Sequence, residues 1–355
     1  MYPALRGEVR ADACVVGLGG SGLACVDELL DAGVSVVALD AGRVAGAAAG
    51  RNGGLLRAGV SRFHHDARAR YGAARAARLY AATAAERERL VRRLPGVVRR
   101  CGFVRLASDP TEERDCRAQL TALLADGFEA LWFDGRVGCG VLVPHDAAVN
   151  PVARCRLEAA AVSARGAWLH EQSTALDVNR GVVETAEGRV RCRTVIVAVD
   201  GGLTRLVPEL ANRVRPARLQ MIGAETPQTT ELPVAGAARW GWDYWQRLDD
   251  ARIAFGGCRD VGGSSEWTAD GTVTSEVQRA LESQLERLTG QPAVVTHRWS
   301  AIVGYTDDGL PVLDQVRPGV WAVGAYSGTG NLLGAVCGRA VARLALGLTN
   351  ESPLD

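Results

Sequence analysis

A glycine-rich turn near the beginning of the chain limits the folds open to it. Residues 17–22 read Gly-Leu-Gly-Gly-Ser-Gly and follow directly on the apolar run 13–16. Apolar residues then recur at helical spacing as far as Ala32, and a second apolar run, 34–39, ends at Asp40. A strand, a helix and a strand within about forty residues form one βαβ unit, so we predict a Rossmann-type fold here.

The same segment predicts a dinucleotide site. Gly17 permits a tight turn, Gly19 lets the backbone approach a pyrophosphate, and Gly22 allows close packing of helix on strand. Asp40 lies 23 positions after Gly17, where a carboxylate accepts hydrogen bonds from ribose hydroxyls and disfavours a 2′-phosphate. The alternative is a structural glycine-rich turn without a ligand. The motif by itself does not separate NAD from FAD.

Composition excludes several other classes of protein. All 41 basic residues are arginine, so Schiff-base chemistry through lysine, a PLP enzyme and a P-loop are excluded. A net charge of +1 gives no field for nucleic acid. The nine cysteines never show Cys-x-x-Cys spacing, which argues against a disulfide framework and against a metal site. No apolar run approaches the roughly 18 residues of a membrane span, so we expect a cytoplasmic protein.

Three further segments lie far apart in the sequence. Residues 50–54 read Gly-Arg-Asn-Gly-Gly, residues 306–312 read Thr-Asp-Asp-Gly-Leu-Pro-Val, and residues 324–331 read Gly-Ala-Tyr-Ser-Gly-Thr-Gly-Asn. By composition, the first is equally well a flexible connector. The last precedes an apolar helix predicted over 332–346, whose amino end turns a positive dipole toward the loop.

At these segments the sequence resembles the D-amino-acid-oxidase superfamily of FAD enzymes, which includes glycine oxidase and sarcosine oxidase. The nearest pattern is that of the γ-glutamylputrescine oxidase branch, which carries Gly-Arg-Asn-Gly-Gly at the place of residues 50–54. Relatives that attach flavin through cysteine carry it near Val303, so the resemblance implies noncovalent FAD. The motif and the resemblance together give the following candidate FAD-binding residues: Gly17, Gly19, Gly20, Ser21, Gly22, Asp40, Ala41, Gly42, Arg43, Gly50, Arg51, Asn52, Gly53, Gly54, Ala175, Gly201, Leu310, Ser327, Gly328, Thr329, Gly330, Asn331 and Leu332.

The cofactor segments lie at opposite ends of the chain, which predicts an α/β protein with a discontinuous FAD-binding domain. We expect it to comprise residues 1–93, 140–212 and 301–355. Residues 94–139 and 213–300 have a different sequence pattern. It predicts a capped helix after Asp109, strand-like stretches, and an amphipathic helix over 275–288. We predict that they form a smaller α+β substrate domain on a mostly antiparallel sheet.

Substrate-binding candidates are Arg57 and Tyr244. The resemblance implies that Arg57 matches a carboxylate-binding arginine of the sarcosine-oxidase branch, although a structural or surface role is an equal alternative. The sequence departs from the family in two places, because Val303 replaces the arginine of the glycine-oxidase branch and Leu332 replaces a lysine. Tyr244 belongs to the aromatic run 240–245, which is either a substrate-facing strand or core.

Catalytic candidates are His64 and Tyr305. An imidazole at His64, beside His65, would accept a proton from an ammonium group, and the alternative is a helix start or surface pair. Tyr305 adjoins the segment 306–312, and the resemblance places it at the site.

The resemblance implies oxidation of an amine, amino acid or imino acid to an imine by hydride transfer to FAD. The electron acceptor is either O₂ or a redox partner, because the oxygen-activating lysine of sarcosine oxidases is absent. Two alternatives stay open. One is a noncatalytic or electron-shuttling FAD-binding subunit, and the other is an NAD-linked dehydrogenase, which leaves residues 50–54 and 324–330 unexplained.

Overall fold

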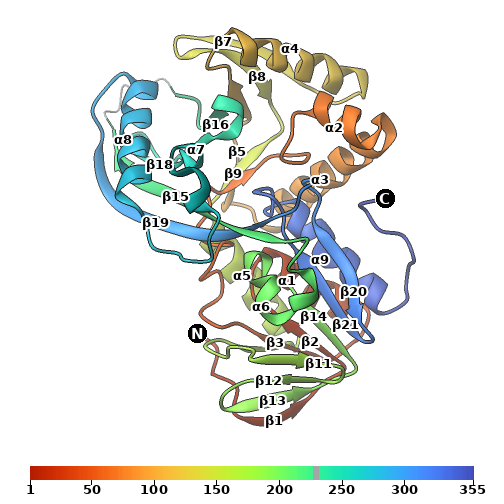
Figure 1. Ribbon diagram of the computed structural model, residues 1–355. Coiled ribbons are helices and arrows are strands. Elements are labelled where there is room, and N and C mark those ends of the chain that lie inside the picture. Colours follow the sequence, from red (N-terminus) through yellow and green to blue (C-terminus); the bar gives the residue numbers. More distant parts are fainter. Residues whose placement is uncertain (227–231) are drawn as a thin grey trace. The chain divides into compact units, whose positions relative to one another are not determined.

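The computed structural model describes residues 1–226 and 232–355, and the chain divides into two compact units (Figure 1). Unit 1 comprises Met1–Arg51, Asn150–Ala217 and Ile302–Asp355. Unit 2 comprises Asn52–Val149 and Arg218–Ala301. The α/β class, with a discontinuous first part, agrees with the fold class predicted from the sequence. The two units are similar in length.

Unit 1 is built on a six-stranded sheet whose pairings are parallel except for the antiparallel pair at one edge. Its central strands consist almost entirely of buried apolar residues, as expected for a parallel sheet covered on both faces. The strand order across the sheet is β10 (Trp168–His170), β3 (Val36–Leu39), β2 (Ala13–Val16), β14 (Thr194–Val197), β21 (Val320–Gly324) and β20 (Val312–Arg317).

Three helices pack together in unit 1. The helix α1 (Gly20–Asp31) contacts both α5 (Pro151–Ala164) and α9 (Leu333–Ala345). A side chain at Gly338 of α9 would overlap the backbone oxygen of Ser21 in α1, so glycine permits this close approach. The observed bounds of α9 lie within one residue of those predicted.

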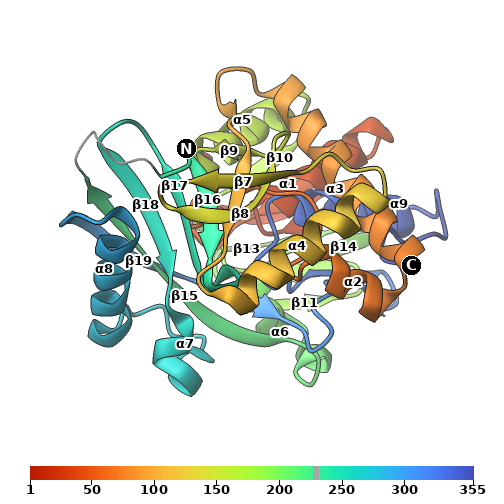
Figure 2. The same cartoon turned by 90° about the horizontal axis from the view of Figure 1, so that it is seen from above.

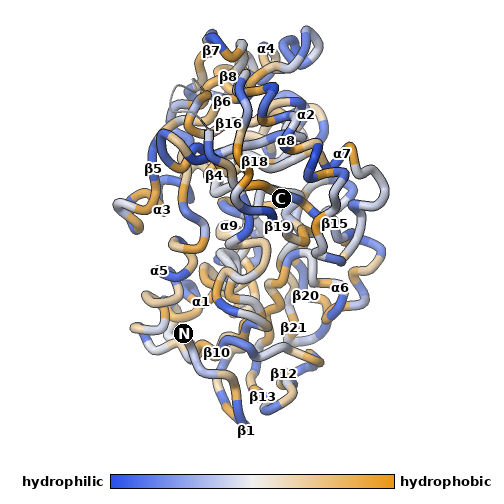
Figure 3. Tube along the Cα trace, turned by 90° about the vertical axis from the view of Figure 1, so that its left-hand side faces the viewer, coloured by the Kyte–Doolittle hydropathy of each residue, from blue (hydrophilic) through white to orange (hydrophobic). Residues whose placement is uncertain are grey.

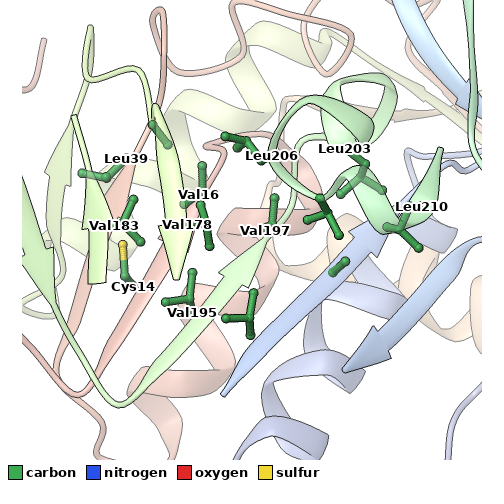
Figure 4. Packing of buried hydrophobic residues seen from close by; sticks show 14 of the residues in the cluster. Cys14, Val16, Leu39, Val178, Val183, Val195, Val197, Leu203, Leu206 and Leu210 are labelled. Atoms are coloured by element: carbon green, nitrogen blue, oxygen red, sulfur yellow. The ribbon is translucent and has the colours of Figure 1, made fainter. Parts of the chain in front are cut away.

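A four-stranded sheet also contributes to the hydrophobic core of unit 1. Its valines, among them Val178, Val183 and Val190, pack against Cys14 and Val195 of the large sheet (Figure 4). In β13, Arg189 and Arg191 flank Val190, and in β12, Glu184 follows Val183, so hydrophilic and hydrophobic colours mix along these strands in Figure 3. The strands, in sheet order, are β1 (Gly7–Arg10), β13 (Gly188–Arg191), β12 (Val182–Glu184) and β11 (Asp177–Asn179), and the short helices η1 (Asp200–Gly202), α6 (Leu203–Leu206) and η2 (Pro208–Leu210) follow β14.

Unit 2 contains most of an eight-stranded sheet in which β16 and β6 pair in parallel and the other recorded pairings are antiparallel. The helix α8 (Ser275–Thr289) buries Val277, Leu281 and Leu285 against this sheet, as the amphipathic pattern predicts. The strand order is β19 (Val294–Tyr305), β15 (Arg215–Glu225), β18 (Arg252–Gly257), β17 (Asp243–Arg247), β16 (Ala235–Ala238), β6 (Phe103–Leu106), β8 (Gly138–Val143) and β7 (Leu131–Gly135), with the unit boundaries at 217 and 301 falling inside β15 and β19.

A second group of elements in unit 2 comes from residues outside the predicted substrate domain. Residues 52–93 and 140–149 were expected in the FAD-binding domain, but they lie in unit 2. The reason is pairing, because the short strand β9 bonds to both β4 and β5, and α2 packs against α3 and α4. Figure 2 shows α4 beside β7 and β8. The bounds are β4 (Leu55–Leu56), β9 (Ala147–Val149), β5 (Val98–Arg100), α2 (His64–Tyr71), α3 (Ala73–Arg93) and α4 (Pro110–Ala125).

The aromatic run 240–245 is not one strand, contrary to the first of its two predicted interpretations. Trp240 lies in a short turn, η3 (Arg239–Gly241), where its φ is 55°, and its backbone N–H donates to Glu112. Only the strand β17 that follows is extended, so Tyr244 and Trp245 point to opposite faces. Trp245 is fully buried in the core. Unit 2 also contains α7 (Arg259–Gly262) and η4 (Gly263–Glu266).

Within residues 1–226 and 232–355, none of the helices combines the length and the apolar character that crossing a bilayer requires.

Candidate functional site

The turn between β2 and α1 has the geometry that its sequence predicts. Gly17 has a φ of 111°, and a side chain there would overlap the backbone of Ala198. A side chain at Gly22 would overlap the carbonyl oxygen of Gly17. Both positions therefore require glycine on steric grounds. No side chain caps the amino end of α1, so its first backbone N–H groups stay available to an anion.

Asp40 sits at the end of β3 and closes this turn. Its Oδ2 accepts a hydrogen bond of 2.9 Å from the N–H of Leu18, and its Oδ1 accepts one of 2.8 Å from the N–H of Gly42. Burial raises the pKa of the carboxyl, and the two backbone hydrogen bonds oppose that rise. The carboxylate keeps further lone pairs for hydroxyl donors, which suits a ribose. The neighbouring residues Ala41, Gly42 and Arg43 are exposed.

The last glycine-rich loop lies against the start of α1. Ala325, Ser327 and Gly328 all have positive φ, so the loop is tightly wound before α9. The hydroxyl of Tyr326 lies 2.5 Å from the hydroxyl of Ser21, and both side chains are buried. Side chains at Gly330 and Gly334 would crowd the ring of Tyr326. The two glycine motifs, predicted from opposite ends of the sequence, are thus adjacent within unit 1.

Arg154 is a residue of this region that the sequence reasoning missed. It lies on α5 with 1% of its surface exposed, and its Nη1 donates to the backbone oxygen of Asn331 over 2.7 Å. Its Nη2 would lie 3.2 Å from a side-chain carbon built at Gly20, and it has no hydrogen-bond partner among the described residues. Its only sequence signal is its place in the first turn of α5, after the N-cap Asn150, whose side chain accepts from Ala153.

The second glycine-rich segment is divided between the two units. Gly50 and Arg51 belong to unit 1, where a side chain at Gly50 would overlap the backbone of Ala45. In unit 2, Gly53 and Gly54 are buried. A side chain at Gly53 would lie 3.3 Å from the ring of Tyr244. The structure therefore brings together two residues that were singled out separately in the sequence.

The other predicted cofactor residues of unit 1 are mostly buried. Thr306 donates from its hydroxyl to the oxygen of Leu310 over 2.6 Å, which closes the turn that follows Tyr305. The hydroxyl oxygen of Tyr305 would lie 3.6 Å from a side-chain carbon built at Gly328, so Tyr305 borders the last glycine-rich loop. Ala175 is part of the hydrophobic core, and Gly201 packs against residues 302–303. Leu332 is the N-cap of α9, one residue before the helix.

His64 is the first residue of α2 and is almost completely buried. Its Nε2 lies 2.7 Å from Oδ2 of Asp126, and its ring packs edge-on against Tyr80 and Phe128. Burial lowers the pKa of the imidazole, and the Asp126 carboxylate opposes that shift. The backbone N–H of His64 donates to the side chain of Gln119. The contacts anchor His64 firmly, and its role as a base stays a prediction.

Arg57 lines two adjoining cavities within unit 2. Its guanidinium lies 5.9 Å from the centre of the Phe103 ring, and burial lowers its pKa. His64 lines the first of these cavities, so Arg57 and His64 border a common space. Within the described residues, no group of three or more His, Cys, Asp or Glu side chains is arranged to hold a metal ion.

Comparison with known proteins identifies the class to which this fold and glycine-rich site belong. The model of the FAD dependent oxidoreductase family, abbreviated DAO, matches residues 12–344. The chain therefore belongs to this family of FAD-dependent oxidoreductases, and FAD is its cofactor.

Two relatives match the chain over almost its whole length. A probable oxidoreductase OrdL of Rhizobium meliloti is 27% identical over 388 aligned positions, which cover 100% of this chain and 87% of that protein. The gamma-glutamylputrescine oxidoreductase of Escherichia coli is 27% identical over 382 positions, with 98% and 86% covered. This similarity agrees with the branch predicted from residues 50–54.

Solved structures share the fold at lower identity. Glycine oxidase from Geobacillus kaustophilus superposes with a TM-score of 0.77 at 22% identity, covering 95% of both chains. L-proline dehydrogenase from P. horikoshii superposes with a TM-score of 0.78 at 15% identity, covering 99% of this chain and 96% of that one.

The residues present fit a bound dinucleotide. Three features favour an anionic group at the amino end of α1. This end has no side-chain cap, the turn before it has glycines where a side chain would overlap backbone, and the unpartnered nitrogen of Arg154 lies beside Gly20. At the end of β3, the carboxylate oxygens of Asp40 can accept hydrogen bonds from the hydroxyl groups of the dinucleotide.

Proposed function

We propose that the chain oxidises an amine or amino acid to the corresponding imine, using FAD bound noncovalently in unit 1. Membership of the FAD-dependent oxidoreductase family is the observation that carries this proposal. The names of the similar proteins support it, since they describe oxidation of a putrescine conjugate, of glycine and of proline. When bound, FAD supplies the acceptor for the hydride that leaves the carbon next to the amine nitrogen.

The residues of unit 1 bind and orient the cofactor in this proposal. The N–H groups at the start of α1 and the guanidinium of Arg154 hold the pyrophosphate, and Asp40 holds the ribose hydroxyls. The predicted residues Gly50 and Arg51, together with those of the segment 327–332, line the rest of the cofactor. The absence of cysteine at Val303 favours noncovalent attachment.

In unit 2, Arg57 and Tyr244 are the residues that we assign to substrate binding. The ring of Tyr244 offers an apolar face beside Gly53, which suits an amine substrate. Tyr305 and His64 remain the catalytic candidates. The proton that the amine nitrogen loses requires an acceptor, and a neutral imidazole at His64 is one such group, because burial lowers its pKa.

An anaerobic absorbance titration tests the proposal. The FAD-loaded protein is mixed with a panel of amines, amino acids and N-methyl amino acids, and the flavin bands are followed. We expect at least one compound to bleach the bands, and admitting air then tests O₂ as the acceptor against a separate redox partner. Flavin that no member of the panel bleaches would contradict amine oxidation.

A Tyr305→Phe variant supplies a matched test of the catalytic assignment, because it removes one hydroxyl and keeps the ring. We expect slower bleaching with unchanged FAD content. Unchanged kinetics would remove Tyr305 from the catalytic residues.

A further inference from the structure

Two of the nine cysteines lie next to one another within unit 1. Cys14 is in β2 and is fully buried, whereas Cys192 is half-buried in the turn between β13 and β14. The two thiols form a hydrogen bond with one another. Figure 4 shows Cys14 beside Val183 of the four-stranded sheet, and Cys192 packs against the same hydrophobic cluster. No spacing in the sequence marks this pair, because tertiary packing alone joins its members.

The chemical difference between the two thiols follows from their contact. The hydrogen bond with Cys14 lowers the pKa of Cys192, and burial opposes that shift. The same hydrogen bond, and next burial, raise the pKa of Cys14. The thiolate is the reactive form of cysteine, so Cys192 is the nucleophile of the pair. Cys192 also has an exposed part that a small reagent reaches, whereas Cys14 has none.

The backbone around the pair lets one of the two residues approach the other. Cys14 is held on both sides, since β2 pairs in register with β3 and with β14. Cys192 lies between the last paired residue of β13, Arg191, and the first paired residue of β14, Thr194. A disulfide needs its sulfurs at about 2.05 Å, closer than two hydrogen-bonded thiols. The turn at Cys192 supplies this approach without breaking a strand pairing.

A metal ion does not account for the pair. In the part of the chain that the structure describes, no group of three or more His, Cys, Asp or Glu side chains is arranged to hold one. Two thiols alone fall short of the four ligands of a structural zinc site. Oxidation to a disulfide is the chemistry that two adjacent thiols share.

We propose that Cys14 and Cys192 are a redox-sensitive pair that hydrogen peroxide closes to a disulfide. The thiolate of Cys192 attacks one peroxide oxygen, the O–O bond breaks, and hydroxide leaves, so that Cys192 becomes a sulfenic acid. The sulfur of Cys14 then attacks the sulfur of Cys192, and the thiol proton leaves with the sulfenic hydroxyl as water. Two thiols lose two electrons, and one peroxide becomes two waters.

The bond would tie the turn between β13 and β14 to the strand that leads into the glycine-rich turn. Because the two cysteines are far apart in the sequence, the crosslink restricts the unfolded chain strongly and stabilises unit 1. Hydrogen peroxide is also what an oxidase releases when O₂ is its acceptor, but the pair does not depend on the proposed amine oxidation.

Peptide mapping without reductant tests the proposal on the FAD-loaded protein. The protein is reduced with a phosphine, freed of it, treated with hydrogen peroxide, alkylated in denaturant and cut with trypsin. Trypsin cuts after arginine, so residues 11–43 and residues 192–193 form separate fragments. We expect them as one linked species, with a mass lower by two hydrogens than that of the two fragments together. Fragmentation in the mass spectrometer separates Cys14 from Cys25, which lies in the same fragment.

Cys101→Ser is the matched control for Cys192→Ser. Cys101 is half-buried like Cys192, but its thiol donates to the carbonyl oxygen of Gly102 over 3.4 Å and its pKa is raised by burial. We expect the linked species in Cys101→Ser as in the parent protein, and none in Cys192→Ser. In Cys14→Ala, Cys192 should stop at the sulfenic acid, which dimedone traps. If Cys14→Ala does not fold, the comparison of Cys192→Ser with Cys101→Ser decides.

Urea unfolding measures the consequence of the crosslink. We expect a higher midpoint for the peroxide-treated parent protein than for the reduced one, and no such rise in Cys192→Ser. Fragments that stay separate after peroxide treatment, a link through Cys25, or direct oxidation of Cys192 to a sulfinic acid would each overturn the proposal. Amine oxidation is tested separately by the bleaching of the flavin, so the failure of one proposal leaves the other standing.

Discussion

The glycine-rich turn of unit 1 and the arginine-lined cavities of unit 2 are two candidate binding regions built on opposite principles. The first is made of backbone, since Gly17 and Gly22 occupy places where any side chain would overlap a neighbouring peptide. The second is made of side chains, among them Arg57, His64 and Tyr80, that different helices and loops bring to one space. Backbone sites depend on residues close in sequence, whereas side-chain sites depend on tertiary packing.

The largest difference between the two regions should appear at Gly22. In Gly22→Ala the new methyl group overlaps the oxygen of Gly17, so we expect loss of bound flavin and destabilisation by about 3 kcal/mol or more. Gly33→Ala, at the other end of α1, is the control. Gly33 has a φ of 74° and open space around it, so this variant costs only about 1 kcal/mol and keeps its flavin. The flavin-to-protein absorbance ratio and urea unfolding measure both effects.

A smaller loss of stability is expected from Asp146→Asn in unit 2. The change leaves the guanidinium of Arg87, which is 7% exposed, without its 2.6 Å ion pair, and breaking a buried pair costs about 3 kcal/mol. Urea unfolding at pH 7 gives the free energy. Asp146 is not among the proposed FAD-binding residues, and its hydrogen bonds go to Arg87 and Ala58, so flavin content should not change. A variant that loses flavin while folded would contradict this assignment.

Asp40→Ala should weaken FAD binding without unfolding the protein. The variant loses two hydrogen bonds to backbone N–H groups and the acceptors proposed for the ribose, so the FAD dissociation constant should rise by about tenfold or more. Fluorescence titration of apoprotein with FAD measures this constant. An unchanged value would exclude Asp40 from the cofactor site.

The pH dependence of stability should reveal the buried Asp200 of unit 1. Burial raises the pKa of this carboxyl to about 6, against the lowering effect of the N–H groups of Tyr326 and Gly304. A folded-state pKa above the unfolded value stabilises the protein at low pH, and this contribution is lost as pH rises from about 4 to about 6. In Asp200→Asn the loss over that window should be shallower. Parallel profiles for the two proteins would refute the assignment.

How much of this structure was predictable depends on the distance between the interacting residues in the sequence. The βαβ unit, the cap at Asp109 and the amphipathic α8 follow from neighbours and were predicted within a few residues. The place of residues 52–93 in unit 2 does not follow from neighbours in the sequence, because it depends on the pairing of β4 with β9.

In the candidate site, too, the residues fixed by local geometry were predicted and those fixed by tertiary packing were not. The glycines and Asp40 were singled out because local geometry requires them. Arg154 was missed, since it is one of 41 arginines and only its burial and its unpartnered nitrogen distinguish it. Trp240 was interpreted as part of a strand, but its contact with Glu112 in α4 fixes a turn.

The most direct measurement of the central claim is the rate of flavin reduction with a substrate deuterated at the carbon next to nitrogen. The bleaching amine is mixed anaerobically with the FAD-loaded protein in a stopped-flow instrument, in protiated and deuterated forms. The account predicts reduction that is distinctly slower with deuterium, because that carbon–hydrogen bond breaks as the hydride leaves. Equal rates over saturating concentrations, or no reduction by any amine, would contradict oxidation at that carbon.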